Sequence, residues 1–360
     1  MSDVIATIEG RIGCITLNRP KALNALSLGM VRDITKVLLD WQHHDQVLAV
    51  AVRGTNKEGP FGAFCAGGDI RYFHQAATAG DPSLEDFFTE EYRLNHLIHT
   101  YPKPYIALMD GIVMGGGMGI SQGASVRVVT ERTKMAMPET NIGLFPDVGG
   151  GYFLSRCAGR LGEYLGLTGH MLQGEDAVHA GLADGLVASG KLAHLWQTLI
   201  ETPFENGEAV ERWVTTRFDH LERTSLPHRA EMDTAFALPS VGEILHTLES
   251  SGDEWSAHTA KTLRQRSPLM LHVVLEQIRR ARSMGLADDL RMERDLVRHC
   301  FALRPVSQSE TVEGIRALAV DKDHQPKWQP AKVEEVDAAE VAAFFVSPWP
   351  AHAHPLRELN

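Results

Sequence analysis

Four short segments of this sequence combine glycines with acidic residues, and together they could catalyse a reaction at a carbonyl carbon. They are residues 63–71, 111–119, 137–140 and 143–151. The first two are glycine-rich and each follows a strand candidate, so they would expose backbone N–H groups at helix N-termini. Two such groups aimed at one point form an oxyanion hole, and a nearby carboxylate would supply a base or a nucleophile. The alternative is that these glycines only permit close packing of helix and strand.

Other motifs compete with this interpretation. Residues 185–191 have the spacing of a phosphate-binding loop, but Leu192 follows where a magnesium-binding hydroxyl is needed. Residues 119–123 match the GxSxG elbow of serine hydrolases around Ser121. That elbow requires a strand directly before the serine, whereas the nearest strand candidate ends at Met109, so we expect Ser121 inside a helix. The histidines form no HExxH or comparable metal-ligand set, and Cys65 is expected to pack rather than react.

The elements that must position these loops alternate between strand and helix over the first two thirds of the chain. Short apolar runs predict strands, and the spacing of Met30, Ile34, Leu38 and Trp41 predicts a helix beginning near Ser27. After about residue 200, helical patterns dominate. Ser267 and Pro268 are expected to open one helix, and a capping box is expected at Ser307 and Glu310. The strand candidates are 4–8, 11–17, 48–52, 105–109, 126–129 and 135–137.

Composition narrows the class of protein. The 360 residues are 44% hydrophobic and 22% charged, which is typical of a globular chain. A net charge of −11 argues against general binding of nucleic acid or anionic lipid. The absence of a long apolar stretch argues against a membrane span. Four scattered cysteines suggest a reducing compartment. The acidic start does not resemble a signal or transit peptide, so we expect a cytoplasmic protein.

Several motifs in one order make the chain resemble the enoyl-CoA hydratase/isomerase (crotonase) superfamily, and more narrowly its 3-hydroxyisobutyryl-CoA hydrolase branch. The resemblance extends from about residue 4 to about residue 335. It implies an α/β fold, with a crotonase-like core of repeated ββα units over 1–200 and a mainly helical C-terminal region over 201–360. The motifs are FCAGGDIR, MGGGMG, MPET, GLFPDVGGGYF, EEYRLN, KPYIALMDGI and DKDHQPKW.

The resemblance also implies roles for individual residues. The N–H groups of Gly68 and Gly116 would form the oxyanion hole, and Glu139 and Asp147 would be the catalytic acids. Gly119 stands where hydratases carry a first catalytic glutamate, which favours the hydrolase branch. The implied substrate-binding residues are Glu91 for the acyl group and Ala66, Gly67, Asp69 and Ile70 for coenzyme A.

For two of these acids, a purely structural interpretation is also open. Glu91 follows Glu90, and a charge run of this kind usually lies on a solvated helix face. Asp147 follows Pro146 and could be a turn residue.

The activity implied is hydrolysis of a short 3-hydroxyacyl-CoA thioester, most closely that of 3-hydroxyisobutyryl-CoA in valine degradation. Glu139 would either attack the carbonyl or activate a water molecule. Coenzyme A would enter as part of the substrate, and no other cofactor or metal is expected. Homo-oligomers occur among relatives. Three alternatives remain: a hydratase or isomerase of the same fold, a serine thioesterase using Ser121, and a non-catalytic acyl-CoA-binding protein.

Overall fold

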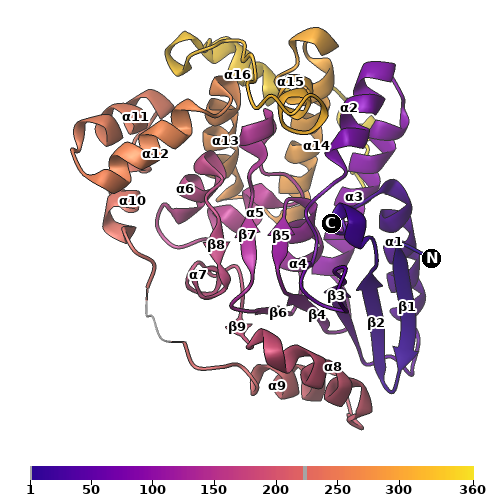
Figure 1. Ribbon diagram of the computed structural model, residues 1–360. Coiled ribbons are helices and arrows are strands. Elements are labelled where there is room, and N and C mark those ends of the chain that lie inside the picture. Colours follow the sequence, from indigo (N-terminus) through magenta and orange to yellow (C-terminus); the bar gives the residue numbers. More distant parts are fainter. Residues whose placement is uncertain (1, 222–224) are drawn as a thin grey trace. The chain divides into compact units, whose positions relative to one another are not determined.

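The computed structural model (Figure 1) describes residues 2–221 and 225–360. Its contacts define two compact units. Unit 1 comprises Met1–Gly68, Arg93–Ala136 and Met171–Leu226, and unit 2 comprises Asp69–Tyr92, Met137–His170 and Pro227–Asn360. All the named strands lie in unit 1, whereas unit 2 is helical. The predicted α/β class is therefore confirmed, and no strand is named after residue 186 in the described residues.

Unit 1 contains a six-stranded sheet in the order β1-β2-β3-β4-β6-β9 and a three-stranded sheet in the order β5-β7-β8. Gly10, at φ +59°, turns the chain between β1 and β2, which are antiparallel. Strands β2, β3 and β4 are almost entirely buried, as expected for parallel strands covered on both faces. The strands are β1 (Val4–Glu9), β2 (Ile12–Leu17), β3 (Ala49–Gly54), β4 (Tyr105–Met109), β5 (Ile112–Met114), β6 (Val126–Val129), β7 (Lys134–Ala136), β8 (Leu172–Gln173) and β9 (Gly185–Leu186).

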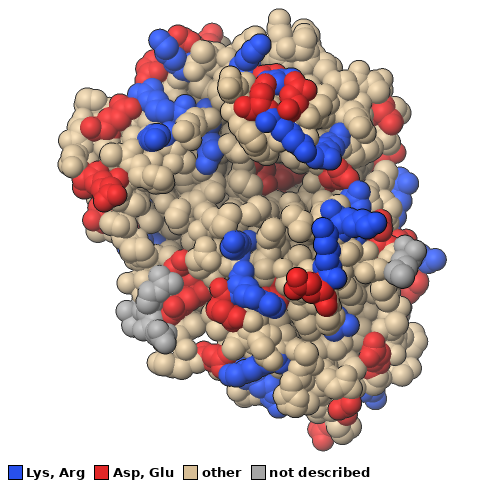
Figure 2. All heavy atoms as spheres, viewed as in Figure 1, with Lys and Arg blue, Asp and Glu red and all other residues tan. Residues whose placement is uncertain are grey.

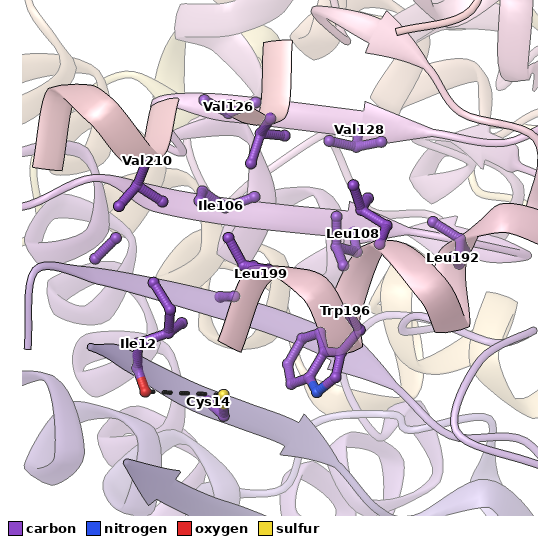
Figure 3. Packing of buried hydrophobic residues seen from close by; sticks show 14 of the residues in the cluster. Ile12, Cys14, Ile106, Leu108, Val126, Val128, Leu192, Trp196, Leu199 and Val210 are labelled. Atoms are coloured by element: carbon purple, nitrogen blue, oxygen red, sulfur yellow. Dashed lines mark hydrogen bonds between the residues drawn. The ribbon is translucent and has the colours of Figure 1, made fainter. Parts of the chain in front are cut away.

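Helices α8 and α9 cover one face of the six-stranded sheet. The apolar stripe of α8, which includes Leu192, Trp196 and Leu199, packs on sheet residues such as Ile106 and Leu108 (Figure 3). Complete burial of such side chains contributes about 1.5–3 kcal/mol each. This core holds the strand ends from which the glycine loops leave. The helices of unit 1 are α1 (Leu28–Trp41), α4 (Gly116–Gln122), α7 (Gly174–His179), α8 (Leu192–Glu201) and α9 (Gly207–Thr215).

Helix α3 (Ser83–His99) contributes Ser83–Tyr92 to unit 2 and its remaining residues to unit 1. In unit 2, α13 packs against α5 and α6, and α15 packs against the short 3-10 helix η2 (Glu139–Ile142). The other helices of unit 2 are α2 (Ile70–Ala79), α5 (Gly150–Ser155), α6 (Leu161–Thr168), α10 (Arg229–Ala235), α11 (Val241–Ser250), α12 (Glu254–Arg264), α13 (Pro268–Ala281), α14 (Leu286–Ala302), α15 (Glu310–Ile315) and α16 (Ala338–Phe344), with a π-helical turn at Arg316–Val320.

Two helix starts test the capping predictions. Ser267 caps α13 as predicted, because its side chain accepts a hydrogen bond from the Met270 N–H. The capping box predicted at Ser307 is wrong. The cap of α15 is Ser309, whose side chain accepts from the Val312 N–H, and Ser307 lies in the preceding 3-10 turn. The predicted division of the chain at residue 200 stays a prediction, since each compact unit draws on several stretches of sequence.

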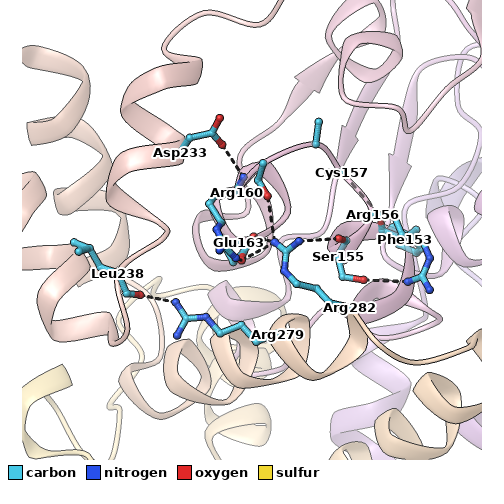
Figure 4. Close-up of polar contacts among 12 residues, drawn as sticks. Phe153, Ser155, Arg156, Cys157, Arg160, Glu163, Asp233, Leu238, Arg279 and Arg282 are labelled. Atoms are coloured by element: carbon cyan, nitrogen blue, oxygen red, sulfur yellow. Dashed lines mark hydrogen bonds and ion pairs between the residues drawn. The ribbon is translucent and has the colours of Figure 1, made fainter.

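An ion-pair network around the buried Glu163 joins α6 to Arg282, the residue that follows α13, within unit 2 (Figure 4). The Glu163 carboxylate is fully buried and accepts two hydrogen bonds of 2.7 Å from Arg282. Arg160 lies 3.0 Å from the same carboxylate. A buried carboxylate needs such partners, because desolvation of an unpaired charge is costly.

We therefore expect Arg282→Met to lower the free energy of unfolding by about 2 kcal/mol, less than a fully buried pair would lose because Arg282 is partly exposed. The physical cause is a buried carboxylate left with one cation. Urea unfolding of the variant measures this loss. The double variant Glu163→Leu/Arg282→Met should recover part of it, and a single variant as stable as the wild type would contradict the assignment.

Candidate active site

The two predicted oxyanion loops lie side by side within unit 1. Cys65 is paired in parallel with Val113 of β5, with its N–H donating to the Ile112 carbonyl at 2.9 Å and its carbonyl accepting from the Met114 N–H at 3.0 Å. Gly67 has φ +103°, which favours glycine, and a Cβ built there would lie only 3.3 Å from the Met114 carbonyl oxygen of the second loop. Glycine at 67 therefore allows the two loops to approach each other closely.

The peptide N–H groups of Gly68 and Gly116 are available for a ligand in the backbone pattern of unit 1. Within the described residues, neither donates to a backbone carbonyl outside the helices and strands. Gly116 is the first residue of α4, where a helix leaves its N–H groups without partners. Oxyanion binding by these two groups stays a prediction.

Ser121 lies inside α4, as predicted, and is fully buried. Its hydroxyl donates to the Gly117 carbonyl at 2.8 Å and approaches the Met118 carbonyl at 3.2 Å. A serine nucleophile instead needs a base that accepts its proton. This geometry argues against the serine-elbow interpretation.

We expect Ser121→Ala to keep at least half of the wild-type turnover, because the hydroxyl bonds only to its own helix. Thiol release from an acyl-CoA thioester measures this. Treatment with an organophosphate should leave the protein unlabelled. Loss of turnover in a folded Ser121→Ala protein, or labelling of Ser121, would instead support a serine thioesterase.

Three predicted acids come together within unit 2. Glu91, Glu139 and Asp147 are 2%, 7% and 6% exposed, and their charges interact. Tyr92, which the sequence analysis did not assign, donates from its phenol to Asp147 Oδ2 at 2.9 Å. The solvated interpretation of Glu91 is therefore wrong. One oxygen of Glu91 and one of Glu139 are buried without a protein hydrogen-bond partner.

Burial and mutual repulsion favour the protonated forms of these acids. Burial, with the charges of Asp147 and Glu139, raises the pKa of Glu91 well above its ordinary value. Burial and the Asp147 charge do the same for the pKa of Glu139. Burial raises the pKa of Asp147 to about 7, against the opposing effect of the Tyr92 hydrogen bond. Clustered acids with raised pKa values are typical of sites that transfer protons at neutral pH.

Glu139 is held by the backbone around η2. The Leu144 N–H donates to the Glu139 carbonyl at 3.0 Å, and the Thr140 side chain donates to the Leu167 carbonyl at 3.1 Å. Thr311 donates to the Gly143 carbonyl at 2.6 Å, where η2 ends. These contacts with α6 and α15 hold the turn that carries the buried Glu139 side chain.

The predicted coenzyme A residues are divided between the units. Ala66 and Gly67 belong to unit 1, where the Ala66 N–H donates to the Leu23 carbonyl at 3.0 Å. Asp69 and Ile70 begin unit 2, and Asp69 caps α2 by accepting from the Tyr72 N–H at 3.4 Å. Their role in binding coenzyme A stays a prediction.

The sequence analysis also missed several buried polar groups. Asn95 in unit 1 has neither amide atom paired with protein, and Asp289 and Glu293 in unit 2 are fully buried acids. Asn95 ends the EEYRLN motif but was given no role, and no motif contains Asp289 or Glu293, whose neighbours in sequence form an ordinary amphipathic helix. Only the i, i+4 spacing of Asp289 and Glu293 indicates that the two acids share a helix face.

Other kinds of site find little support among residues 2–221 and 225–360. No group of three or more metal-ligating side chains occurs there, and no helix of that part is long and apolar enough to span a bilayer. The four cysteines are buried and unpaired by disulfides. Basic and acidic side chains are interspersed on the face drawn in Figure 2. The expected lack of a metal, of a further cofactor and of nucleic-acid binding stays a prediction.

Comparison with known proteins places the chain in a family. The family model described as enoyl-CoA hydratase/isomerase matches residues 12–345. The chain therefore belongs to the enoyl-CoA hydratase/isomerase family, and the predicted crotonase-like fold is confirmed.

Within this family, the chain is similar to proteins named mitochondrial 3-hydroxyisobutyryl-CoA hydrolase. The Gallus gallus protein is 40% identical over 341 residues, which cover 93% of this chain and 86% of the relative. The Homo sapiens protein is 39% identical over 351 residues, covering 96% and 89%. The resemblance to the hydrolase branch is thereby confirmed.

Two solved structures share the whole fold. A carnitinyl-CoA dehydratase from Mycobacterium thermoresistibile superposes with a TM-score of 0.89 at 37% identity, with 100% of both chains covered. An enoyl-CoA hydratase from Rhodobacter sphaeroides 2.4.1 has a TM-score of 0.86 at 37% identity, covering 96% of this chain and 98% of that one.

Proposed function

We propose that this protein hydrolyses the thioester of 3-hydroxyisobutyryl-CoA to 3-hydroxyisobutyrate and free coenzyme A. The observation that carries the proposal is the buried cluster of Glu91, Glu139 and Asp147, in a chain about 40% identical to proteins named for this reaction. The cluster has a carboxylate to act at the acyl carbon and further acids to hold a hydroxyl or a water molecule. A plain binding protein would have no need to bury three interacting acids, which is costly.

In the proposed reaction, the thioester oxygen accepts hydrogen bonds from the Gly68 and Gly116 N–H groups. Removal of one such donor typically costs about 3–4 kcal/mol of transition-state stabilisation.

Glu139 has two chemically balanced routes. As a nucleophile, its carboxylate oxygen bonds to the acyl carbon, the C–S bond breaks, and coenzyme A leaves as a thiolate that takes up a proton. Water then hydrolyses the resulting anhydride and releases the acid. As a base, Glu139 instead removes a proton from the water that attacks the acyl carbon. In both routes, Asp147 and Glu91 orient the 3-hydroxyl group or the water.

A hydratase is the second candidate, because both solved structures described above carry names of hydro-lyases. Gly119 weighs against a hydratase. The resemblance places a first catalytic glutamate at this position in hydratases, whereas this chain has a buried glycine in α4. A dehydratase that holds water between two carboxylates would have to recruit another acid.

The deciding experiment compares thiol release with change in enoyl absorbance on four thioesters: 3-hydroxyisobutyryl-, 3-hydroxypropionyl-, 3-hydroxybutyryl- and crotonyl-CoA. Hydrolysis predicts thiol release that is fastest with 3-hydroxyisobutyryl-CoA and slow with crotonyl-CoA, which lacks the hydroxyl. Hydration predicts loss of crotonyl absorbance without free thiol. Tight binding of all four esters without either product would indicate a non-catalytic protein.

The remaining properties of the proposed enzyme are its cofactor, its location and its assembly. Coenzyme A is part of the substrate, and we propose no other cofactor. The cytoplasmic location expected from the sequence stays a prediction, and the vertebrate relatives are named mitochondrial. Assembly into a homo-oligomer also stays a prediction, which sedimentation of the purified protein would test.

A further inference from the structure

The loop that carries Asp147 has a strained backbone. Val148, the next residue, has φ +56°, and Gly149 has φ +87°. A β-branched residue rarely adopts the left-handed region, which costs roughly 1–2 kcal/mol for an L-residue. Such strain persists only where surrounding contacts impose it, and it is often found at functional sites. Val148 is also 3% exposed, so its side chain cannot relax into solvent.

Three side chains from two helices impose this conformation, and we call Gln277, Asp289 and Glu293 the loop clamp. Before Asp147, Gln277 of α13 donates to the Pro146 carbonyl at 2.7 Å. After it, Glu293 of α14 accepts from the Gly149 N–H at 2.7 Å and the Gly151 N–H at 2.9 Å. Asp289 accepts from the Tyr152 N–H at 2.8 Å. The clamp therefore grips the backbone on both sides of Asp147.

The glycines of this loop fit the clamp closely. A Cβ built at Gly151 would lie 2.4 Å from Asp289 Oδ1, and one at Gly150 would lie 2.9 Å from the Pro146 Cβ. The N–H groups of Gly149 and Gly151 bind the clamp acid Glu293, whereas the Gly150 N–H donates to the Asp147 carbonyl at 2.8 Å. This differs from the oxyanion role considered for the glycine loops at 63–71 and 111–119.

The clamp is expensive to bury. Asp289 and Glu293 are both fully buried, one helical turn apart on α14, and their carboxylates are compensated mainly by backbone N–H groups. Burial, with the Asp289 charge, raises the pKa of Glu293 well above its ordinary value. Two buried acids are a costly way to hold a buried loop, but a strong one, since carboxylate–amide hydrogen bonds are shorter and stronger than neutral ones.

We propose that Glu293 and Gln277 are positioning residues for thioester hydrolysis. Through the backbone of residues 146–151, they hold the Asp147 carboxylate at its hydrogen bond with Tyr92 and within the acid cluster. The inference rests on the proposed function for its kinetic consequences, whereas its geometric claim stands independently. Neither residue touches the substrate in this scheme.

The main test is Glu293→Gln. It keeps the shape of the side chain but replaces one of the two oxygens that accept from the loop with an NH₂ group, which cannot accept a hydrogen bond. A displacement of about 1 Å at a reacting group can cost about 100-fold in rate, so we expect kcat to fall by about that factor while KM changes little. Gln277→Met, which removes the donor to the Pro146 carbonyl and to Glu293 Oε1 at 3.2 Å but leaves the Glu293 carboxylate in place, should lower kcat by a smaller factor. If Glu293→Gln does not fold, Gln277→Met tests the same inference.

Glu163→Gln is the matched control, because Glu163 is another fully buried acid of unit 2 but binds arginines rather than the loop. It should lose stability and keep kcat. The pH profile gives a second readout. If Asp147 leaves its position among Tyr92, Glu91, Glu139 and Glu293, its titration should move to lower pH in the clamp variants but not in the control.

A crystal structure of Glu293→Gln, or of Gln277→Met, tests the geometry independently of activity. The inference predicts that Asp147 Oδ2 no longer lies at the 2.9 Å observed from the Tyr92 hydroxyl. An unmoved carboxylate, or clamp variants with wild-type kcat and pH profile, would overturn it. A wild-type protein that releases no thiol from any of the four thioesters would instead refute the proposed function, and the crystal structure would still decide the inference.

Discussion

Replacement of Glu139 by glutamine should lower hydrolysis of 3-hydroxyisobutyryl-CoA by about 1,000-fold, within the range typical of a lost general base or nucleophile. Glutamine has nearly the same shape, but it cannot accept a proton or form an anhydride. Binding of coenzyme A esters should persist, because the backbone donors of unit 1 are unchanged. Thiol release measures turnover, and equilibrium titration with a non-hydrolysable thioether analogue measures binding.

The same variant should remain folded, and its stability should depend less on pH. Burial raises the pKa of Glu139 above its value in the unfolded chain, so the folded state favours the protonated acid. This contribution is fully present below the ordinary glutamate pKa and is lost as pH rises through the folded-state value. Thermal unfolding at pH 5 and at pH 8 should therefore differ more for the wild type than for Glu139→Gln. Near wild-type turnover in a folded Glu139→Ala protein would eliminate Glu139 as the catalytic group.

A single-turnover experiment in ¹⁸O-labelled water separates the two roles of Glu139. If the carboxylate attacks the thioester, hydrolysis of the anhydride incorporates ¹⁸O partly into Glu139, which mass spectrometry of the peptide detects. If Glu139 activates water, the label enters only the released 3-hydroxyisobutyrate. The wild-type peptide that contains Glu163, an acid bound by Arg160 and Arg282, provides the control and should carry no label.

Asp147→Asn should also have a large effect, lowering kcat by about 100-fold and removing the contribution of Asp147 to the pH profile. The pKa of Asp147 is raised to about 7 by burial, so its ionised fraction grows between about pH 6 and pH 8. We expect wild-type kcat to rise over that interval as Asp147 loses its proton and can orient the hydroxyl or the water. The asparagine variant should lack the part of this rise that belongs to Asp147.

Tyr92→Phe is the matched variant for this prediction. The Tyr92 hydroxyl donates to Asp147 and lowers its pKa, so its removal should move the step in kcat to higher pH. Because the charges of Glu91 and Asp147 interact, the midpoint of the step belongs to the cluster, and the direction in which it moves is the diagnostic quantity. A step that stays unchanged in Asp147→Asn, or moves to lower pH in Tyr92→Phe, would contradict this role for Asp147.

Local sequence patterns determined much of the architecture of this protein. The apolar runs of β3 and β4 and the spacing along α1 predict their elements, because burial on both faces or on one helical stripe leaves a regular hydrophobic pattern. Ser267 identified a helix start by its local hydrogen bond. The capping box at Ser307 failed because two serines stand two residues apart, and only packing decides which of them begins the helix.

For the acidic residues as well, the sequence determined one part and the tertiary structure decided the other. The motif order identified Glu139, Asp147 and Glu91 as candidates, but the sequence left Glu91 equally consistent with a solvated face. Burial by distant segments of unit 2 decided that question, and it also set the direction of the pKa shifts. Tyr92 and the loop clamp were visible only in the tertiary structure. Glu293 stands more than 140 positions after the glycines it binds, and hydrogen bonds over such separations leave no periodic trace in the sequence.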